Sequence, residues 1–545
     1  MKQYLGFTGD KLINCILAAS TTGFLLFGYD QGVMSGIIGN KVFNADFPAT
    51  KMANNDDVYH STIQGTVTAV YEVGCLIGAL FALFFGDRLG RRKVIILGGL
   101  IMMIGTLIMI TSMTGHLPLV QFIVGRVICG VGNGMNTSTI PSWQAETSKS
   151  HNRGAHVCFE ASMIAIGTVI AYWIDFGLDF VDSSVAWRFP IAFQIVFSVI
   201  LMGLVFVLPE SPRWLLTQHK EAEALAVMAA LNGSTIEDPE TIAQKEAIYE
   251  SIRQNSQKVT NRELLDRGRS KNLRRTLIGA SAQIFQQLGG CNAVIYYAPV
   301  LYEQSLGMTR LMSMILSGVT IIVYALFALS SFWLVEKVGR RPLFLWGAVG
   351  QCVSMVITFG CLIPDTKATA NGAVLGLFMF LSFFGATWLS LPWLYPAELS
   401  PLKIRTKANA ISTSSNWLFN FFVVQVTPVM VASIHWGTYL FFAILNGLFV
   451  PIVYFYYPET KGRSLEELDV IFAKSHVGGK APVQVAKDEP FMEHHEILEA
   501  IRQLELDEKA EQGDLENAHA DAAATVDPEA TAQGSLMEKE SGASR

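Results

Sequence analysis

A short charged phrase occurs twice in the chain: residues 87–92 read DRLGRR, and residues 336–341 read EKVGRR. Each copy follows a long apolar run, and the two lie 249 residues apart. Two further motifs repeat at offsets of 252 and 249 residues, namely Glu146/Arg153 with Glu398/Arg405, and Pro209-Glu210 with Pro458-Glu459. Three motif pairs at nearly one offset indicate that the chain consists of two homologous halves.

The composition is that of a protein embedded in a membrane. Of the 545 residues, 51% are hydrophobic and only 16% are charged, whereas a soluble protein has about 25% charged residues. Twelve apolar segments are long enough to cross about 30 Å of hydrocarbon. They are centred near residues 25, 73, 102, 128, 165, 198, 286, 322, 353, 383, 418 and 447. We therefore expect an all-α membrane protein with twelve transmembrane helices in two pseudo-symmetric six-helix halves.

Lysine and arginine are concentrated in alternate loops, which predicts the orientation of the spans. Both termini are expected in the cytoplasm of a multi-pass plasma-membrane protein. The residues from 476 onward are rich in Glu, Asp, Ala, Gly and Ser, a composition typical of disorder. The predicted organisation is an N-terminal six-helix bundle at 1–208, a cytoplasmic linker with short helices at 209–271, a C-terminal six-helix bundle at 272–475, and a disordered acidic tail at 476–545.

The repeated motifs place acids and arginines at the predicted cytoplasmic ends of helices. Because a guanidinium pairs bidentately with a carboxylate from a neighbouring helix, we expect a cytoplasmic gate that closes one face and opens when its pairs break. The alternative is that the basic residues only set the orientation. The candidate gate residues are Asp87, Arg91, Arg92, Glu146, Arg153, Glu210, Glu336, Arg340, Arg341, Glu398, Arg405 and Glu459.

The segment centred near residue 286 carries three amides, Gln286, Gln287 and Asn292. An amide side chain both donates and accepts hydrogen bonds without charge, which suits the hydroxyls of a sugar or polyol. Their spacing allows all three to line one stretch of a bent helix. The alternative for a single glutamine inside a membrane is a hydrogen bond between helices.

Asp30 lies inside the first predicted span, and Arg126 is the arginine that we find inside a predicted span of the first half. A charge at the bilayer centre costs about 3 kcal/mol on insertion scales, so each needs a partner or, for the acid, a proton. We expect Asp30 to pair with Arg126 and to release it on protonation from outside, which would make the proton the coupling ion. The alternative is a static ion pair. No cofactor is expected.

Taken in order, these motifs resemble the sugar porters of the major facilitator superfamily. The resemblance is carried by DRLGRR, Gly125-Arg126, Glu146/Arg153, PESPRWL at 209–215, QQLGGCNAVIYY at 286–297, the second GRR and PETKGRSLEEL at 458–468. Within that family the chain most resembles the fungal glycerol/proton symporter and its sugar-transporter-like relatives, through AYWIDFG at 171–177, WRFPIAFQIVF at 187–197 and SLPWLYPAE at 390–398.

The resemblance implies the major facilitator fold and proton-coupled uptake of a small carbohydrate or polyol, a monosaccharide or glycerol, by alternating access. It implies that Trp393 and Asn420 bind substrate together with the three amides, and that Tyr296 and Tyr297 close over it from outside.

Three positions depart from the pattern of the family. Hexose carriers have a glutamine where this chain has Ala161, preceded by Glu160, and commonly an asparagine where it has Tyr324. The loss of two amides favours a small polyol. Glu160 could instead accept hydrogen bonds from hydroxyls or pair with an arginine. The third departure is Leu83, which stands where the family has glycine.

Two alternative functions remain open: a facilitative hexose uniporter and a non-transporting nutrient sensor. An enzyme is disfavoured because HExxH, Gly-x-Ser-x-Gly and phosphate-loop motifs are missing from the sequence. The expected partners are a small sugar or polyol and the lipid bilayer, without nucleic acid, and the protein is expected to be a monomer.

Overall fold

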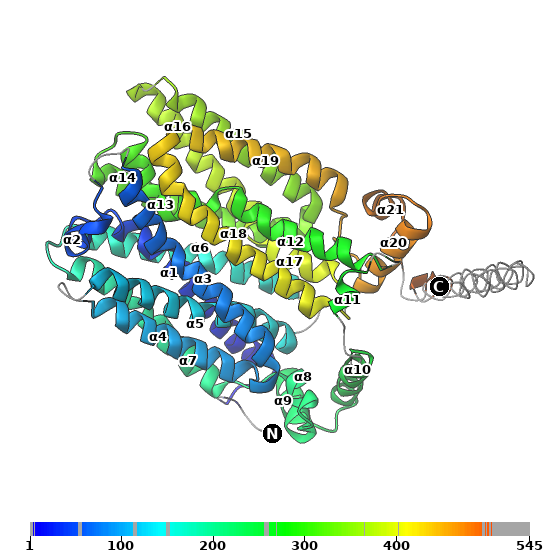
Figure 1. The fold of residues 1–545 in the computed structure, drawn as a ribbon. Coiled ribbons are helices and arrows are strands. Elements are labelled where there is room, and N and C mark those ends of the chain that lie inside the picture. Colours follow the sequence, from blue (N-terminus) through cyan, green and yellow to red (C-terminus); the bar gives the residue numbers. More distant parts are fainter. Residues whose placement is uncertain are drawn as a thin grey trace, which may run out of the picture.

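Two bundles of long helices lie side by side in a computed structural model, with the first half in blue and cyan and the second in green to orange (Figure 1). The structure describes residues 6–52, 57–112, 117–148, 153–255, 261–266, 270–364, 366–401 and 403–492, together with residues 4, 268, 496–497, 499–500 and 503.

The first half contains the long helices α1 (Asp10–Ile37), α3 (Val58–Leu89), α4 (Arg91–Ile110), α5 (Pro118–Thr147), α6 (Arg153–Leu178) and α7 (Val185–Val207). Two short elements, α2 (Lys41–Asp46) and η1 (Pro48–Thr50), connect α1 to α3. The linker forms α8 (Pro212–Thr217), α9 (Glu221–Asn232), α10 (Pro239–Asn255) and α11 (Asn261–Leu264).

The second half repeats this order with α12 (Asn272–Leu288), α13 (Cys291–Gln304), α14 (Arg310–Val338), α15 (Arg340–Leu362), α16 (Lys367–Phe383), a π-helical turn η3 (Phe384–Trp388), α17 (Leu391–Leu399), α18 (Arg405–Ile434) and α19 (Gly437–Tyr456). Two further helices follow, α20 (Leu465–Val477) and α21 (Pro482–Asp488).

Eleven of the described helices are long and apolar enough to cross a membrane. The remaining predicted span, centred near residue 286, is divided into α12 and α13 at Gly289-Gly290. Gly290 has φ +93°, in the left-handed region that favours glycine. The all-helical fold is therefore confirmed, and one of the twelve predicted segments is a broken helix rather than a continuous one.

Replacing Gly290 with alanine is expected to destabilise the protein by about 1–3 kcal/mol, the usual cost of a non-glycine residue held in an unfavourable backbone region. The added Cβ would also lie 2.7 Å from the Phe442 ring. Thermal unfolding in detergent measures the effect. The control is Gly360→Ala in α15, where a Cβ meets no heavy atom within 4 Å. Equal melting temperatures for both variants would contradict this account of the helix break.

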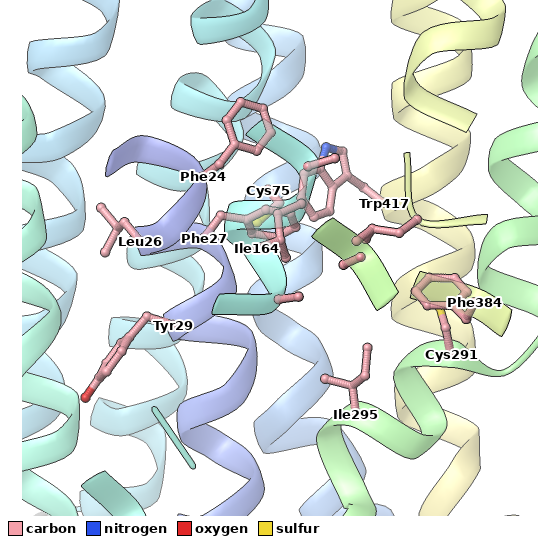
Figure 2. Close-up of a cluster of buried hydrophobic side chains, with 14 of the residues drawn as sticks. Phe24, Leu26, Phe27, Tyr29, Cys75, Ile164, Cys291, Ile295, Phe384 and Trp417 are labelled. Carbon is pink, nitrogen blue, oxygen red and sulfur yellow. The ribbon is translucent and has the colours of Figure 1, made fainter. Parts of the chain in front are cut away.

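The halves contact each other through symmetry-related helices. Helix α3 packs on α18 and α14 packs on α6, and these two pairs correspond under the internal repeat. Near the middle of the interface, Phe27 of α1 meets Trp417 of α18 edge to face, with ring centroids 5.5 Å apart. Figure 2 shows these rings among the buried side chains that both halves contribute.

Polar contacts join the halves at the end remote from the two GRR motifs. We call the end with these motifs the motif end, and the other the opposite end. At the opposite end, Arg310 of α14 donates to the Gly36 carbonyl at 2.8 Å and pairs with Asp179 at 3.2 Å. The Gln425 amide donates to the Thr66 hydroxyl at 3.1 Å. The linker helices, α20 and α21 lie at the motif end (Figure 1).

Helical structure extends further along the chain than predicted. The expected disordered tail begins at 476, but α20 runs to Val477 and α21 occupies part of it. The reason is local packing: Leu468 and Ile471 of α20 form a buried cluster with Val485 and Ala486 of α21. The predicted start of the tail is therefore too early. Residues 504–545 lie outside the described residues.

Candidate functional site

Arg91 organises the motif end of the first half. Its guanidinium binds both carboxylate oxygens of Glu146 at 3.1 Å and one oxygen of Asp87 at 3.0 Å. Asp87 ends α3, Arg91 begins α4 and Glu146 ends α5. One guanidinium thus ties the ends of three helices together, using the bidentate geometry expected for arginine with a carboxylate.

Arg340 makes the same contacts in the second half. It binds Glu398 of α17 at 2.7 Å and Glu336 of α14 at 3.2 Å. The repeated sequence phrase therefore corresponds to a repeated cluster of side chains.

The other acids of the motifs bind backbone instead of arginine side chains. Glu210 accepts from the N–H groups of Arg91 and Arg92, both at 3.1 Å. Glu459 accepts from those of Arg340 and Arg341 at 2.9 and 3.1 Å. These N–H groups begin α4 and α15, where a helix has unpaired donors and the positive end of its dipole. Burial raises the pKa of the Glu210 carboxyl, and the backbone N–H donors lower it.

The second arginine of each GRR also binds backbone. Arg92 donates to the carbonyls of Val205, at 3.0 Å, and Phe206 near the end of α7. Arg341 donates to the carbonyl of Tyr454 at 2.9 Å, near the end of α19. The expectation that these arginines pair with carboxylates is therefore wrong: they bind the unpaired carbonyls of a neighbouring helix end.

The described contacts of the motif residues lie within one half each. Arg405 donates to the carbonyl of Ser400 at 3.2 and 3.1 Å, and the side chain of Arg153 lies outside the described residues. The clusters brace the ends of helices inside each half, so a gate that joins the halves needs further contacts. The gate role remains a prediction.

Replacing Glu459 with glutamine is expected to lower the stability of the second half by about 1–2 kcal/mol, because the neutral amide loses the charge-assisted bonds at the start of α15. Thermal unfolding in detergent reports the loss. Glu336→Gln is the matched control, since its exposed pair with Arg340 is worth about 0–1 kcal/mol. A control that unfolds as early as Glu459→Gln would show that the backbone contacts carry no special weight.

A network of amides lies at the break between α12 and α13. The Asn292 amide nitrogen donates to the side-chain oxygens of Gln287, at 2.8 Å, and Asn420, at 2.7 Å. Gln286 donates to the carbonyl of Trp388 at 2.7 Å and accepts from Asn416 at 2.9 Å. Five amide side chains of this network are buried: Gln286, Gln287, Asn292, Asn416 and Asn420. The break positions the amides because it turns the chain between Gln287 and Asn292.

A cavity lies between the halves beside this network. Figure 2 shows Phe27 and Ile164 of the first half and Ile295 and Phe384 of the second, which line it. The polar part of its lining is Gln31, Gln286, Gln287, Asn292, Asn416 and Tyr324, next to Trp393. The arrangement combines aromatic surfaces with uncharged donors and acceptors, as a small ligand with several hydroxyls requires.

The remaining predicted substrate residues do not line the cavity themselves. Asn420 reaches the cavity through Asn292. Tyr297 donates to the carbonyl of Val424 in α18 at 3.0 Å, and Tyr296 donates across the interface to Glu72 of α3 at 2.7 Å. Both tyrosines are buried, so the structure places them as ties between helices.

Asp30 and Arg126 form a buried pair beside the cavity. The two groups meet at 2.9 Å, and their side chains are 0% and 1% exposed. Arg126 also donates to the Thr68 carbonyl at 3.3 Å and lies over the Tyr71 ring at 4.5 Å. Gln31, the residue after Asp30 in α1, lines the cavity, so the same turn of α1 carries the ion pair and a polar wall residue.

Comparison with known proteins decides the family. The profile described as "Sugar (and other) transporter" matches residues 15–472. The chain is 48% identical over 515 residues to "Sugar transporter STL1" of Saccharomyces cerevisiae, which covers 94% of this chain and 90% of that protein. It is 44% identical over 507 residues to "Major facilitator superfamily transporter mfsA" of Aspergillus fumigatus. That alignment covers 92% of this chain and 94% of the relative. The chain belongs to the sugar porter family.

Solved structures agree with this membership. The proton:xylose symporter XylE, bound to 6-bromo-6-deoxy-D-glucose, matches with a TM-score of 0.72 and 25% identity over 85% of this chain and 100% of that one. This sugar porter is thus a multi-pass membrane protein with the major facilitator fold, and not an enzyme.

Several residues of the site in this sugar porter were not predicted from sequence. Gln31, Asn416 and Glu72 belong to no repeated motif, although Gln31 adjoins Asp30 and Asn416 lies one turn before Asn420. Glu160, considered as a substitute for a lost amide, is buried but does not line the cavity, and its carboxylate oxygens have no hydrogen-bond partner among the described residues. Neither a hydroxyl ligand site nor an arginine partner is seen for it there.

Proposed function

We propose that this sugar porter imports a small polyol or monosaccharide together with a proton, by alternating access of its two halves. The observation that carries the proposal is the position of the Asp30–Arg126 pair, one residue from a cavity lined by neutral amides. Neutral amides suit hydroxyl ligands, and a buried carboxylate with an arginine partner is a group whose proton occupancy alters a local contact. The similarity to XylE, a proton:xylose symporter, supports coupling.

The cavity favours a small substrate such as glycerol. Tyr324 lines it where hexose carriers of the family commonly have asparagine, and its ring lies 6.0 Å from that of Phe384. An aromatic ring therefore occupies a wall position where hexose carriers commonly offer an amide, and a second ring lies beside it. Relatives named as sugar transporters keep a monosaccharide as the second member of the proposed substrate class.

The orientation of the cycle follows from the basic loops. The motif end carries both GRR motifs. By the positive-inside rule we expect this end, and both chain ends, on the cytoplasmic side of the plasma membrane. The motif clusters brace each half as it rocks, and the contacts of Arg310 hold the halves together at the opposite end while the cavity is closed to the outside.

Uptake by yeast lacking its own carriers tests the proposal. We expect saturable, uncoupler-sensitive uptake of labelled glycerol, with external alkalinisation on substrate addition in weakly buffered medium. Competition by glucose, xylose and other polyols then ranks the substrates. Saturable uptake that is insensitive to uncouplers and causes no alkalinisation would show a facilitative uniporter. A protein that reaches the membrane and transports none of these compounds would instead fit a nutrient sensor.

A further inference from the structure

The buried centre of the first half contains a second carboxylate that the proposed function does not use. Glu72 of α3 is fully buried, and its Oε1 accepts from the Tyr296 hydroxyl of α13 at 2.7 Å. Its Oε2 has no hydrogen-bond partner within the described part of the chain. The Tyr296–Glu72 bond joins the two halves, because α3 and α13 belong to different ones.

The guanidinium of Arg126 contacts the turn of α3 that carries Glu72. Arg126 touches α3 at the Thr68 carbonyl, at 3.3 Å, and at the Tyr71 ring, at 4.5 Å. Thr68 precedes Glu72 by one helical turn and Tyr71 is its neighbour, so the guanidinium contacts α3 within about one turn of the Glu72 carboxyl. The charges of both Arg126 and Asp30 act on Glu72.

The charges around Glu72 do not balance without a proton. Titratable groups from three neighbouring helices and from α3 itself act on it: Asp30 of α1, Arg126 of α5, Tyr296 and Cys291 of α13, and Cys75 of α3. Helix α18 adds the neutral amide of Asn420. Two carboxyls therefore share one guanidinium. An uncompensated charge is expensive in a membrane interior, so the group is neutral only when one carboxyl holds a proton.

We propose that Glu72 is a second proton-binding residue of this carrier, and that Asp30 and Glu72 hold one proton between them. When Arg126 pairs with Asp30, as in the structure, the proton is on Glu72. When Asp30 takes up a proton from outside, Arg126 turns to Glu72, and Glu72 releases its own proton towards the cytoplasmic side. The proton on Asp30 then passes to Glu72 as Arg126 turns back to Asp30, which restores the starting state. One proton enters and one leaves, so the charge of the group does not change.

This exchange acts on both the interface and the cavity. A hydrogen bond to a carboxylate is stronger than one to a carboxylic acid, so the Tyr296 bond tightens when Glu72 is ionised. Tyr296 lies one turn beyond Asn292 in α13, and Asn292 itself donates to Asn420 at 2.7 Å. Glu72 therefore transmits the protonation of Asp30 to the helix that carries the substrate amides.

The inference rests on the proposed proton coupling, and the experiment separates the two. Purified protein in proteoliposomes is assayed for accumulation of labelled glycerol or xylose, whichever the competition assay supports, under an inward proton gradient. Counterflow without a gradient is measured in parallel. For Glu72→Gln, both quantities are expressed relative to the unaltered protein. We expect the factor by which the accumulation ratio falls to be at least ten times the factor by which the rate of counterflow falls. The rate of counterflow should also depend less on pH. Glu72→Asp, which keeps a titratable carboxyl, should recover accumulation.

The control is Glu221→Gln, which removes a half-exposed carboxylate from the linker helix α9, where Glu221 pairs with Lys245 at 2.9 Å. It should accumulate substrate like the unaltered protein. Accumulation and a pH profile that Glu72→Gln leaves unchanged would overturn the inference, as would an equal loss of counterflow and accumulation without recovery in Glu72→Asp. If Asp30→Asn loses accumulation and Glu72→Gln does not, only this inference fails. If the unaltered protein does not accumulate substrate, the proposed coupling fails as well.

Discussion

Replacing Asp30 with asparagine is expected to turn a concentrating carrier into an equilibrating one. The amide keeps the approximate shape of the side chain but cannot take up a proton, so the pair with Arg126, now 2.9 Å apart, no longer responds to the gradient. A gradient of about two pH units sustains up to ~100-fold accumulation at one proton per substrate, because each unit is worth about 1.36 kcal/mol. The variant should reach an inside-to-outside ratio of about 1.

Labelled-substrate accumulation in cells or proteoliposomes measures this ratio, with protein amounts matched by immunoblot. Asp30→Glu keeps a carboxyl group on a longer side chain and should retain part of the accumulation. If Asp30→Asn accumulates substrate as well as the unaltered protein does, the pair with Arg126 is a static structural contact and the proton enters elsewhere.

Replacing Asn292 with alanine is expected to raise the apparent KM about 10- to 100-fold. One amide nitrogen of Asn292 contacts both Gln287 and Asn420, and the side chain lines the cavity. Its loss removes a proposed hydrogen bond to the substrate. It also leaves the buried Asn420 oxygen without its donor and the Gln287 oxygen with only the weak Cys291 thiol at 3.8 Å, at about 1–3 kcal/mol for an unsatisfied buried group. Initial rates of uptake over a range of substrate concentrations give the KM.

Gln194→Ala provides the matched control for Asn292. Gln194 is an equally buried amide, but it contacts Thr106 within the first half at 2.9 Å and does not line the cavity. Its removal should lower the amount of folded protein without changing the KM. An Asn292→Ala protein whose KM is unchanged would mean that the network around α12 and α13 only holds helices together.

The two-half fold could be predicted because the decisive motifs are local and repeated. The phrases around Arg91 and Arg340 follow apolar runs, and both the repeat and the hydropathy are visible in the sequence. The break at Gly290 was harder to predict from the sequence. A bend was expected there, but composition cannot tell a bent helix from two helices separated by a residue with positive φ.

The roles of Glu210 and Glu459 show a different limit. Their sequence context gives an acid near arginines, which suggests an ion pair. The structure instead pairs them with the backbone N–H groups of Arg92 and Arg341, which are distant in the sequence. A helix that begins at the second residue of the motif supplies these donors, and its start depends on how the chain turns at Gly90 and Gly339, both at positive φ.

Contacts across the interface were the least predictable part of the site. Glu72 and Tyr296 are 224 positions apart in the chain, and their bond exists only because α3 and α13 meet when the halves assemble. The pairing of Asp30 with Arg126 could be anticipated within one half, because a carboxylate and an arginine inside apolar spans each need a partner. A second carboxylate near that pair required the three-dimensional arrangement.

Simultaneous measurement of proton and substrate fluxes tests the central claim most directly. Purified protein is reconstituted in proteoliposomes with an internal pH indicator, and labelled substrate is added on the side from which it is imported. The account predicts inward proton movement of one proton per substrate molecule and accumulation that collapses with an uncoupler. Substrate entry that stops at equilibrium, with no proton movement above that of empty liposomes, would contradict it.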